Sequence, residues 1–164
     1  VDFALRYLQK RPGSDEFMVE EIFLVLERSD REHVALSLDL LDRAVGDRRQ
    51  LHDRLIDAFA RMSTNYSPMI LDYFSTQAEL PTETMEGLAA VLKDVPYFQV
   101  HLTLRLLDSK QFFSERVEAE MSRLLDHENF FIARRASEHL AKQTLSDAVQ
   151  RRLEAFRQQH RSRL

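Results

Sequence analysis

The segment KQFFSERV, residues 110–117, recurs as KQTLSDAV at residues 142–149, and this recurrence decides the predicted fold. The same offset relates Phe98 to Phe130 and Val100 to Ile132. Earlier parts of the chain are more diverged, but apolar residues still follow a similar spacing, at Ile22, Ile56, Leu88, Met121 and Leu153. Self-similarity at this period is typical of stacked helical hairpins. We therefore expect five helix pairs.

The composition favours helices over strands. Leu occurs 24 times, Val and Ile together occur 14 times, and Gly and Pro total seven among 164 residues. So few turn residues argue against a β fold with many turns. Apolar residues recur every three or four positions, which is the period of a helix. The pattern predicts ten helices and no strands, near 1–10, 15–28, 31–45, 48–63, 67–77, 82–93, 96–108, 112–125, 129–142 and 146–161.

Several residues mark where these helices begin and end. Ser29 and Glu32 have the spacing of a capping box. Gly46 is expected to end one helix in a left-handed conformation, and Asp47 to cap the next. Proline is tolerated in the first helical turn, where its missing N–H is not needed. Three helices are therefore predicted to start at Pro68, Pro81 and Pro96.

A single helical hairpin of this kind exposes an apolar stripe on each side and needs neighbours to bury it. A chain of 164 residues is long enough to form one core without disulfides or metals. We therefore expect a single helical-repeat domain over residues 1–164. Phe98, Phe130 and Phe131 are predicted to fill the space between hairpins, and replacing a buried Phe130 by Ala would cost about 3–5 kcal/mol.

Residues 126–140, DHENFFIARRASEHL, resemble the first helix of a HEAT repeat. In that repeat an Asp-bearing turn precedes a Val or Ile, then Arg, Ala and Leu at helical spacing. The matching residues are Ile132, Arg134 or Arg135, Ala136 and Leu140. The unit from Asp94 lacks the Arg, so the motif is well matched once. The resemblance implies an all-α, right-handed α-solenoid of about five HEAT-like hairpins; the tetratricopeptide pattern fits less well because the chain has no Trp.

The charge distribution bears on the class of partner. The formal net charge of −4 opposes a general role in nucleic-acid binding. Residues 148–164 nevertheless contain five Arg and one Glu. A basic terminal helix suits an acidic partner, a nucleic acid or an anionic membrane, although a solubilising end face explains it equally well. Nucleic-acid binding through this helix is therefore kept as an alternative.

No pattern of catalytic or metal-binding residues stands out. The chain has no Cys, three Gly and no Ser in a Gly-flanked turn, which argues against thiol catalysis, Ser–His–Asp catalysis and phosphate-binding loops. Some HEAT-like oxygenases bind di-iron through His-Glu pairs, but His127-Glu128 is the one such pair and its counterpart in the preceding repeat begins with Val95. We predict no cofactor, no metal and no enzymatic activity; a HEAT-like enzyme subunit is the second alternative.

The prediction that remains is a binding surface. In α-solenoids the second helices usually line the concave side. Cations recur near one level of the predicted second helices, and together with a further Arg of the last helix they form the predicted protein-binding set: Arg61, Lys93, Arg123, Arg152 and Arg157. Acidic residues are interleaved with them, so a mixed solvated face is the competing interpretation. We predict a non-catalytic scaffold or adaptor that binds a partner protein.

The uncharged stretches, as at 62–71 and 95–104, are too short to span a membrane. The chain begins at Val1 without a signal-peptide pattern, so we expect a processed product or a fragment of a longer chain. We predict a cytoplasmic location and no transmembrane segment.

Overall fold

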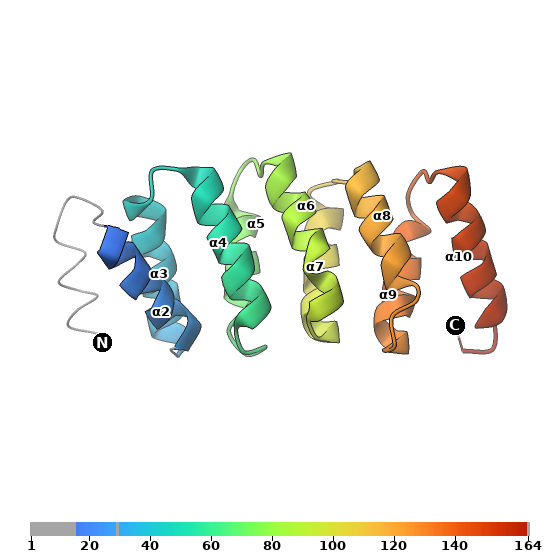
Figure 1. Cartoon of the computed structure of the whole chain (residues 1–164), viewed down its shortest axis with the longest axis horizontal. Helices are drawn as coiled ribbons and strands as arrows, with labels where there is room; N and C mark the ends of the chain where they lie inside the picture. Colours follow the sequence, from blue (N-terminus) through green and yellow to red (C-terminus); the bar gives the residue numbers. More distant parts are fainter. Residues whose placement is uncertain (1–15, 29, 164) are drawn as a thin grey trace. The chain divides into compact units, whose positions relative to one another are not determined.

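The computed structural model describes residues 16–28 and 30–163, and within them the chain forms helices and no strand (Figure 1). The all-α prediction is therefore confirmed. The elements are α2 (Glu16–Arg28), α3 (Arg31–Ala44), α4 (Arg48–Arg61), α5 (Pro68–Thr76), α6 (Thr82–Ala90), the short 3₁₀ helix η1 (Leu92–Asp94), α7 (Tyr97–Ser109), α8 (Glu115–Leu124), α9 (Phe130–Leu140) and α10 (Asp147–Gln159). The helix predicted over 1–10 lies outside the described residues.

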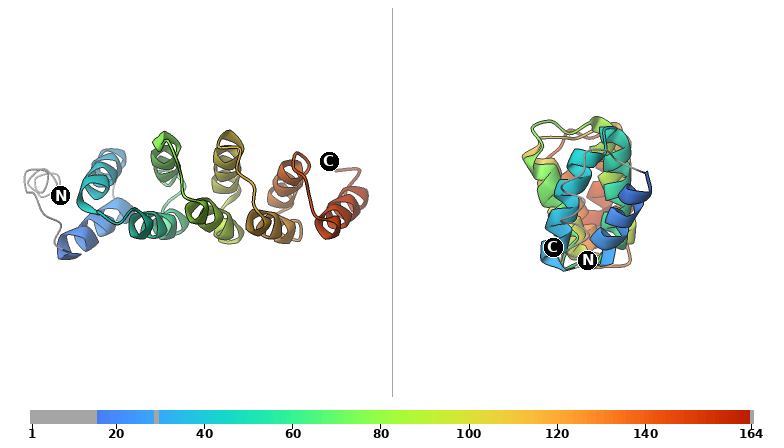
Figure 2. Two further views of the ribbon diagram at one scale, coloured as in Figure 1. Left: turned by 90° about the horizontal axis from the view of Figure 1, so that it is seen from above. Right: turned by 90° about the vertical axis from the view of Figure 1, so that its left-hand side faces the viewer.

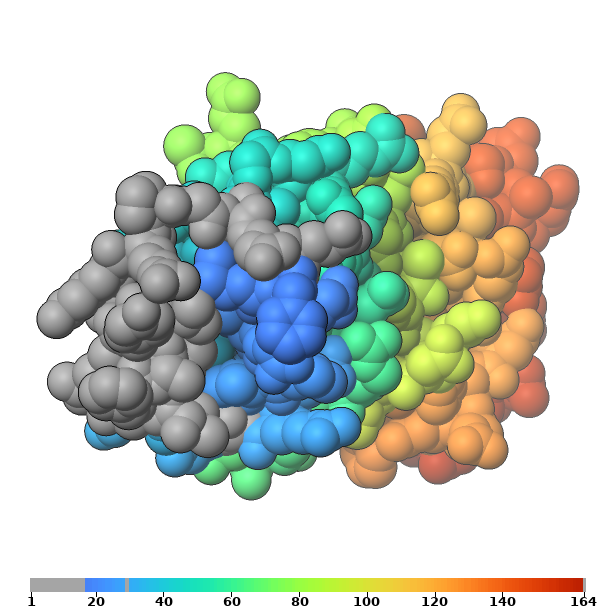
Figure 3. Space-filling view, turned by 60° about the vertical axis from the view of Figure 1, so that its left-hand side comes forward, coloured from blue at the N-terminus to red at the C-terminus, as the bar shows by residue number. Residues whose placement is uncertain are grey.

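The contacts divide the chain into two units, Val1–Leu80 and Pro81–Leu164. In the first unit α2 packs on α3 and α4, and α5 packs on α3 and α4. The even-numbered and odd-numbered helices of this unit form separate layers (Figure 2). In the space-filling view α2 (blue) and α4 (teal) form adjoining parts of one surface (Figure 3). Buried apolar side chains fill the space between the layers, among them Ile22, Leu26, Leu41, Leu55, Phe59 and Phe74.

The second unit has the same alternation. α8 packs on α6 and α10, while α7 packs on α9, so even-numbered and odd-numbered helices again form two layers (Figure 2). Val100 and Ile132, which the sequence offset relates, are both buried on the odd-numbered helices. Leu88, Met121 and Leu153 are buried on the even-numbered ones. The periodic positions therefore face the core of this unit.

One side-chain contact repeats at the offset found in the sequence. The Ser114 hydroxyl, at the start of α8, donates to Glu86 Oε1 of α6 at 2.7 Å. The Ser146 hydroxyl, at the start of α10, donates to Glu118 Oε1 of α8 at 2.6 Å. Ser114 and Ser146 are related by the offset that relates the two copies of the repeated segment, and so are Glu86 and Glu118. The repeated segment therefore has the same structural role in both copies, which is to join successive even-numbered helices.

The helix starts follow capping chemistry, with two differences from the predictions. Asp47 caps α4 as predicted, because its carboxylate accepts from the N–H groups of Arg49 and Gln50 at 3.0 and 3.1 Å. The cap of α3 is Asp30, not Ser29, and its carboxylate accepts from the His33 N–H. Pro68 begins α5, whereas the other two prolines each precede the first helical residue.

The helix ends show where left-handed backbone is needed. The prediction for Gly46 was wrong, because α3 already ends in extended backbone at Val45. Among the described non-glycine residues, Gln111 has a positive φ, of 52°. Its N–H bonds to the Asp108 carbonyl, and the Phe112 N–H bonds to the Leu107 carbonyl, which satisfies the last carbonyls of α7.

The predicted burial of the three phenylalanines was wrong for two of them. Phe98 is 51% exposed and Phe131 is 63% exposed. Each lies at the start of a helix whose inward face is set instead by Val100 or Ile132. Phe130 is half-buried, and its ring stacks on Phe156 with centroids 6.3 Å apart.

Candidate protein-binding surface

Four of the five predicted cations lie beside a carboxylate. Their contacts are Arg61 Nη2 to Glu27 Oε1 at 2.5 Å, Arg123 Nη1 to Glu120 Oε1 at 2.7 Å, Arg152 Nη2 to Asp126 Oδ2 at 2.5 Å, and Lys93 Nζ to Asp94 Oδ2 at 3.9 Å. Lys93 lies in η1 rather than on α6. These pairs favour the mixed solvated face at those positions. Arg61 belongs to the first unit and the others to the second, so a ladder across the chain stays a prediction.

The fifth predicted cation, Arg157, has a different environment. It lines a pocket of about 310 Å³ together with Arg134, Ser137, Glu138 and Arg161, and we call this the cationic pocket. Arg134 Nε donates to Glu138 Oε1 at 3.1 Å. Among the described residues neither the Arg157 nor the Arg161 side chain makes a hydrogen bond or ion pair. Three arginines and one glutamate therefore line one pocket, and the formal positive charge of its lining is in excess.

The preceding repeat shows that these charges are not needed for the packing of a hairpin. At the offset of the repeated segment, Arg134, Glu138 and Arg157 correspond to Leu102, Leu106 and Leu125. Leu106 and Leu125 are buried. The last hairpin thus carries charged side chains where the previous one carries leucines. This replacement of leucines by charged residues is the sequence signal for the pocket. It can be recognised once the two repeats are aligned at the correct offset.

The other arginines of the basic C-terminal segment are used differently. Arg152 pairs with Asp126, and the Arg163 guanidinium lies over the Phe130 ring, 4.0 Å from its centroid. Arg151 is exposed on α10 and does not line the cationic pocket. Arg157 and Arg161 are therefore the two arginines of this segment that line one pocket together.

A cluster of exposed aromatic side chains lies at the starts of α7 and α9. Tyr97 is 39% exposed and its ring centroid is 6.2 Å from that of Phe131, while Phe98 follows Tyr97 on α7. We call Tyr97 and Phe131 the aromatic patch; the exposed Phe98 makes no ring contact with a described residue. Phe131 and Arg134 are three residues apart on α9 and therefore share a helix face. The aromatic patch and the cationic pocket adjoin each other on this helix.

Ionisable side chains inside the second unit join α7 to α9. Asp108 lies 2.8 Å from His139 Nδ1, 3.5 Å from Arg135 Nη2 and 3.4 Å from Lys142 Nζ. The Arg135 side chain is 8% exposed. Burial of the imidazole lowers the pKa of His139, and the opposing effect of the Asp108 carboxylate is smaller. We call these four residues the Asp108 network.

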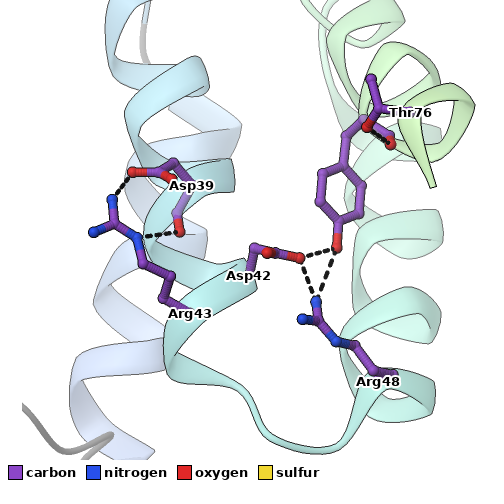
Figure 4. A network of polar contacts seen from close by, with 6 residues as sticks. Asp39, Asp42, Arg43, Arg48 and Thr76 are labelled. Carbon is purple, nitrogen blue, oxygen red and sulfur yellow. Dashed lines mark hydrogen bonds and ion pairs between the residues drawn. The ribbon is translucent and has the colours of Figure 1, made fainter. Parts of the chain in front are cut away.

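The first unit has a related network between α3 and α5. The Tyr73 hydroxyl donates to Asp42 Oδ1 at 2.6 Å, and Arg48 donates to the same oxygen (Figure 4). Burial would raise the pKa of Asp42, but the hydrogen bonds from Tyr73 and Arg48 outweigh it, so the pKa lies below 3.8. Burial and the Asp42 contact raise the pKa of Tyr73 to about 12. We call these three residues the Asp42 network. Each network holds two odd-numbered helices together, which is a structural role.

The His-Glu pair weighed in the sequence belongs to a turn. His127 Nδ1 accepts from the Asn129 N–H at 2.9 Å, directly before α9 begins. Within residues 16–28 and 30–163 no group of three or more His, Asp or Glu side chains is placed to hold a metal ion. In the same part of the chain no helix has both the length and the apolar character needed to cross a membrane.

Comparison of the chain with protein-family models, with curated proteins and with solved structures finds no match. The HEAT resemblance and the cytoplasmic location therefore stay predictions.

Proposed function

We propose that the chain is a non-catalytic scaffold that binds a partner protein through the aromatic patch of its second unit. The observation that carries this proposal is the exposure of two aromatic side chains whose rings lie side by side, Tyr97 and Phe131. Exposed apolar clusters commonly mark interaction sites, and aromatic residues are enriched in protein interfaces. Their rings supply a large contact area and lose little conformational entropy on binding.

The proposal includes the architecture. We infer that the hairpins continue as a right-handed, HEAT-like α-solenoid of about five units. Its support is the alternation of helix layers within each unit and the Ser–Glu contact that recurs in step with the repeated segment. Of the two arginines that could fill the HEAT position, Arg135 is the buried one. A solenoid places successive odd-numbered helices side by side, so that their exposed ends form a continuous surface for an extended partner.

Crosslinking pull-down with Phe131→Ser and Tyr97→Ser tests this proposal. Both variants should capture the partner of the wild-type chain at least tenfold less, because truncating a central interface residue costs more than about 1.4 kcal/mol. Leu24→Ser is the matched control, since Leu24 is also an exposed large apolar residue but lies in the first unit. Equal capture by all four proteins would contradict the proposal.

Nucleic-acid binding is the second candidate, favoured by the unpartnered Arg157 and Arg161 of the described chain and opposed by the net charge of −4. Duplex affinity that falls steeply with salt and depends on Arg157 would establish it. The third candidate is a HEAT-like oxygenase, and stoichiometric iron in the purified protein would favour it.

A further inference from the structure

We propose that the cationic pocket binds the phosphate of a phosphoserine or phosphothreonine side chain in the partner protein. This inference rests on the proposed function in one respect, namely that a partner protein carries the phosphate. It names the chemistry of that partner and assigns a binding role to Arg134, Arg157 and Arg161.

The charges in the pocket define the ligand. Three arginines line the pocket with one carboxylate residue, Glu138, which Arg134 already contacts. The excess is two positive charges. A phosphomonoester carries about −1.5 to −2 at pH 7, so one such group balances the excess. A single carboxylate or a single phosphodiester carries one negative charge and leaves the other cation uncompensated.

The geometry of the pocket suits the same ligand. Arg134 comes from α9, Arg157 from α10 and Arg161 from the turn after α10, so the ligand would be held from two helices. Guanidinium groups offer paired N–H donors that match phosphate oxygens. Ser137 also lines the pocket, but its hydroxyl donates to the Arg134 carbonyl at 2.7 Å. We therefore assign it no contact with the ligand. The pocket volume of about 310 Å³ accommodates a phosphorylated side chain.

The cost of assembling these cations points to a ligand. Arg157 and Arg161 line one pocket without a carboxylate partner among the described residues. Like charges on the lining of one pocket repel each other, and an anion bound there relieves this repulsion. The previous repeat has leucines at three equivalent positions and still folds into the same hairpin. Packing therefore does not require the arginines, whereas anion binding does.

The position of the pocket connects it to the aromatic patch. Phe131 faces Tyr97 of α7, and Arg134, three residues later on the same helix, faces the cationic pocket. A partner segment lying across α9 would place apolar side chains on the patch and a phosphorylated residue in the pocket. These two contacts on one helix would then select a partner segment that is both apolar and phosphorylated.

The direct test is a titration of the chain with acetyl-phosphoserine amide, followed by NMR of the arginine Nε–H groups. The signals of Arg134, Arg157 and Arg161 should shift saturably. Acetyl-serine amide should shift none of them, and dimethyl phosphate, which mimics the nucleic-acid backbone, should bind at least tenfold more weakly. Lowering the pH from about 7.5 to about 5.5 should weaken phosphoserine binding, because the phosphate loses its second charge near pH 6.

Single substitutions locate the binding to the pocket. Arg157→Ala and Arg161→Ala should each weaken phosphoserine binding about tenfold, since each removes a charge-assisted hydrogen bond. Arg151→Ala is the matched control, because Arg151 lies on α10 outside the pocket, and it should leave affinity unchanged. Equal weakening by Arg151→Ala, or dimethyl phosphate binding as tightly as phosphoserine, would overturn the inference.

Partner capture separates this inference from the proposed function. Phosphatase treatment of the partner and Arg157→Ala should each reduce capture, and Phe131→Ser should reduce capture while phosphoserine binding is retained. Capture that is lost in Phe131→Ser but is unaffected by phosphatase and by Arg157→Ala overturns the pocket and leaves the scaffold proposal intact. If phosphoserine binds the pocket but Phe131→Ser captures the partner fully, the pocket stands and the aromatic patch is not the binding surface.

Discussion

The Asp42 network of the first unit and the Asp108 network of the second occupy equivalent places but use different chemistry. In each, a carboxylate near the end of one odd-numbered helix reaches a residue of the next odd-numbered helix at the same sequence separation, Tyr73 or His139. Tyr73 is a neutral donor, and Arg48 beside it is exposed. His139 and Arg135 are buried. The repeat therefore determines where two helices are connected by side chains. The individual residues determine how much buried charge each network contains.

The largest effect is expected from Asp108→Ala. This change leaves Arg135 and His139 buried without their acid, and loss of one partner from a buried ion pair costs about 3–5 kcal/mol. Urea denaturation followed by helical circular dichroism measures the change. Asp126→Ala is the control, because that carboxylate is 78% exposed in its pair with Arg152 and its loss should cost less than about 1 kcal/mol. Similar costs for both variants would contradict the importance of the buried charge.

Asp42→Ala should have a smaller effect, about 1–3 kcal/mol. It removes the acceptor of the half-buried Tyr73 hydroxyl, but Arg48 remains in contact with solvent. The same denaturation experiment compares it with Asp108→Ala. If Asp42→Ala proved the more destabilising change, the distinction drawn between the two networks would be wrong.

Stability should fall as the pH drops below about 6.5, because burial lowers the pKa of His139 below that ordinary value. The unfolded chain then binds a proton that the folded chain does not, so the stabilisation is complete above pH 6.5 and is lost on acidification. Asp108, Arg135 and Lys142 face this imidazole, and the Phe113 ring lies 5.9 Å away. His139→Gln should lose less stability than the wild type between about pH 7.5 and about pH 5.5.

Part of this pH dependence should remain in His139→Gln, because burial also lowers the pKa values of His52 and His101. His52→Gln measures the contribution of the first unit with the same sign. A wild-type stability that is flat across this range, or that rises on acidification, would show that His139 is not held in its neutral form.

The smallest effect on folding is expected from Phe131→Ser. This residue lies on the same helix as Arg135 and His139 but is 63% exposed, so its loss should change the free energy of unfolding by less than about 0.5 kcal/mol. Phe130→Ala should cost more, because that ring is half-buried against Phe156. A large cost for Phe131→Ser would mean that reduced partner capture reflects unfolding rather than a lost contact.

Helical periodicity and capping residues were enough to predict the helices, because Val100 and Ile132 specify an inward face and Asp47 a start. The end of α7 was predicted to within one residue, but the left-handed backbone after it was not, because Gln111 adopts a positive φ without being glycine. The other residues of the cationic pocket could not be predicted, because they depend on which chain segments lie close together. Arg157 was predicted, but Arg134 joins it only through the packing of α9 on α10, and Arg161 joins it from the turn after α10. The paired cations, such as Arg152, likewise depend on which acid lies opposite.

The central claim, that the starts of α7 and α9 contact a partner protein, is tested most directly by photo-crosslinking from single positions. A benzophenone amino acid replaces Phe131 in one protein and Leu24 in another, both of which are exposed in the native chain. The account predicts a discrete covalent adduct with one partner from position 131 and none from position 24. Adducts of equal yield from both positions, or from position 24 alone, would contradict it.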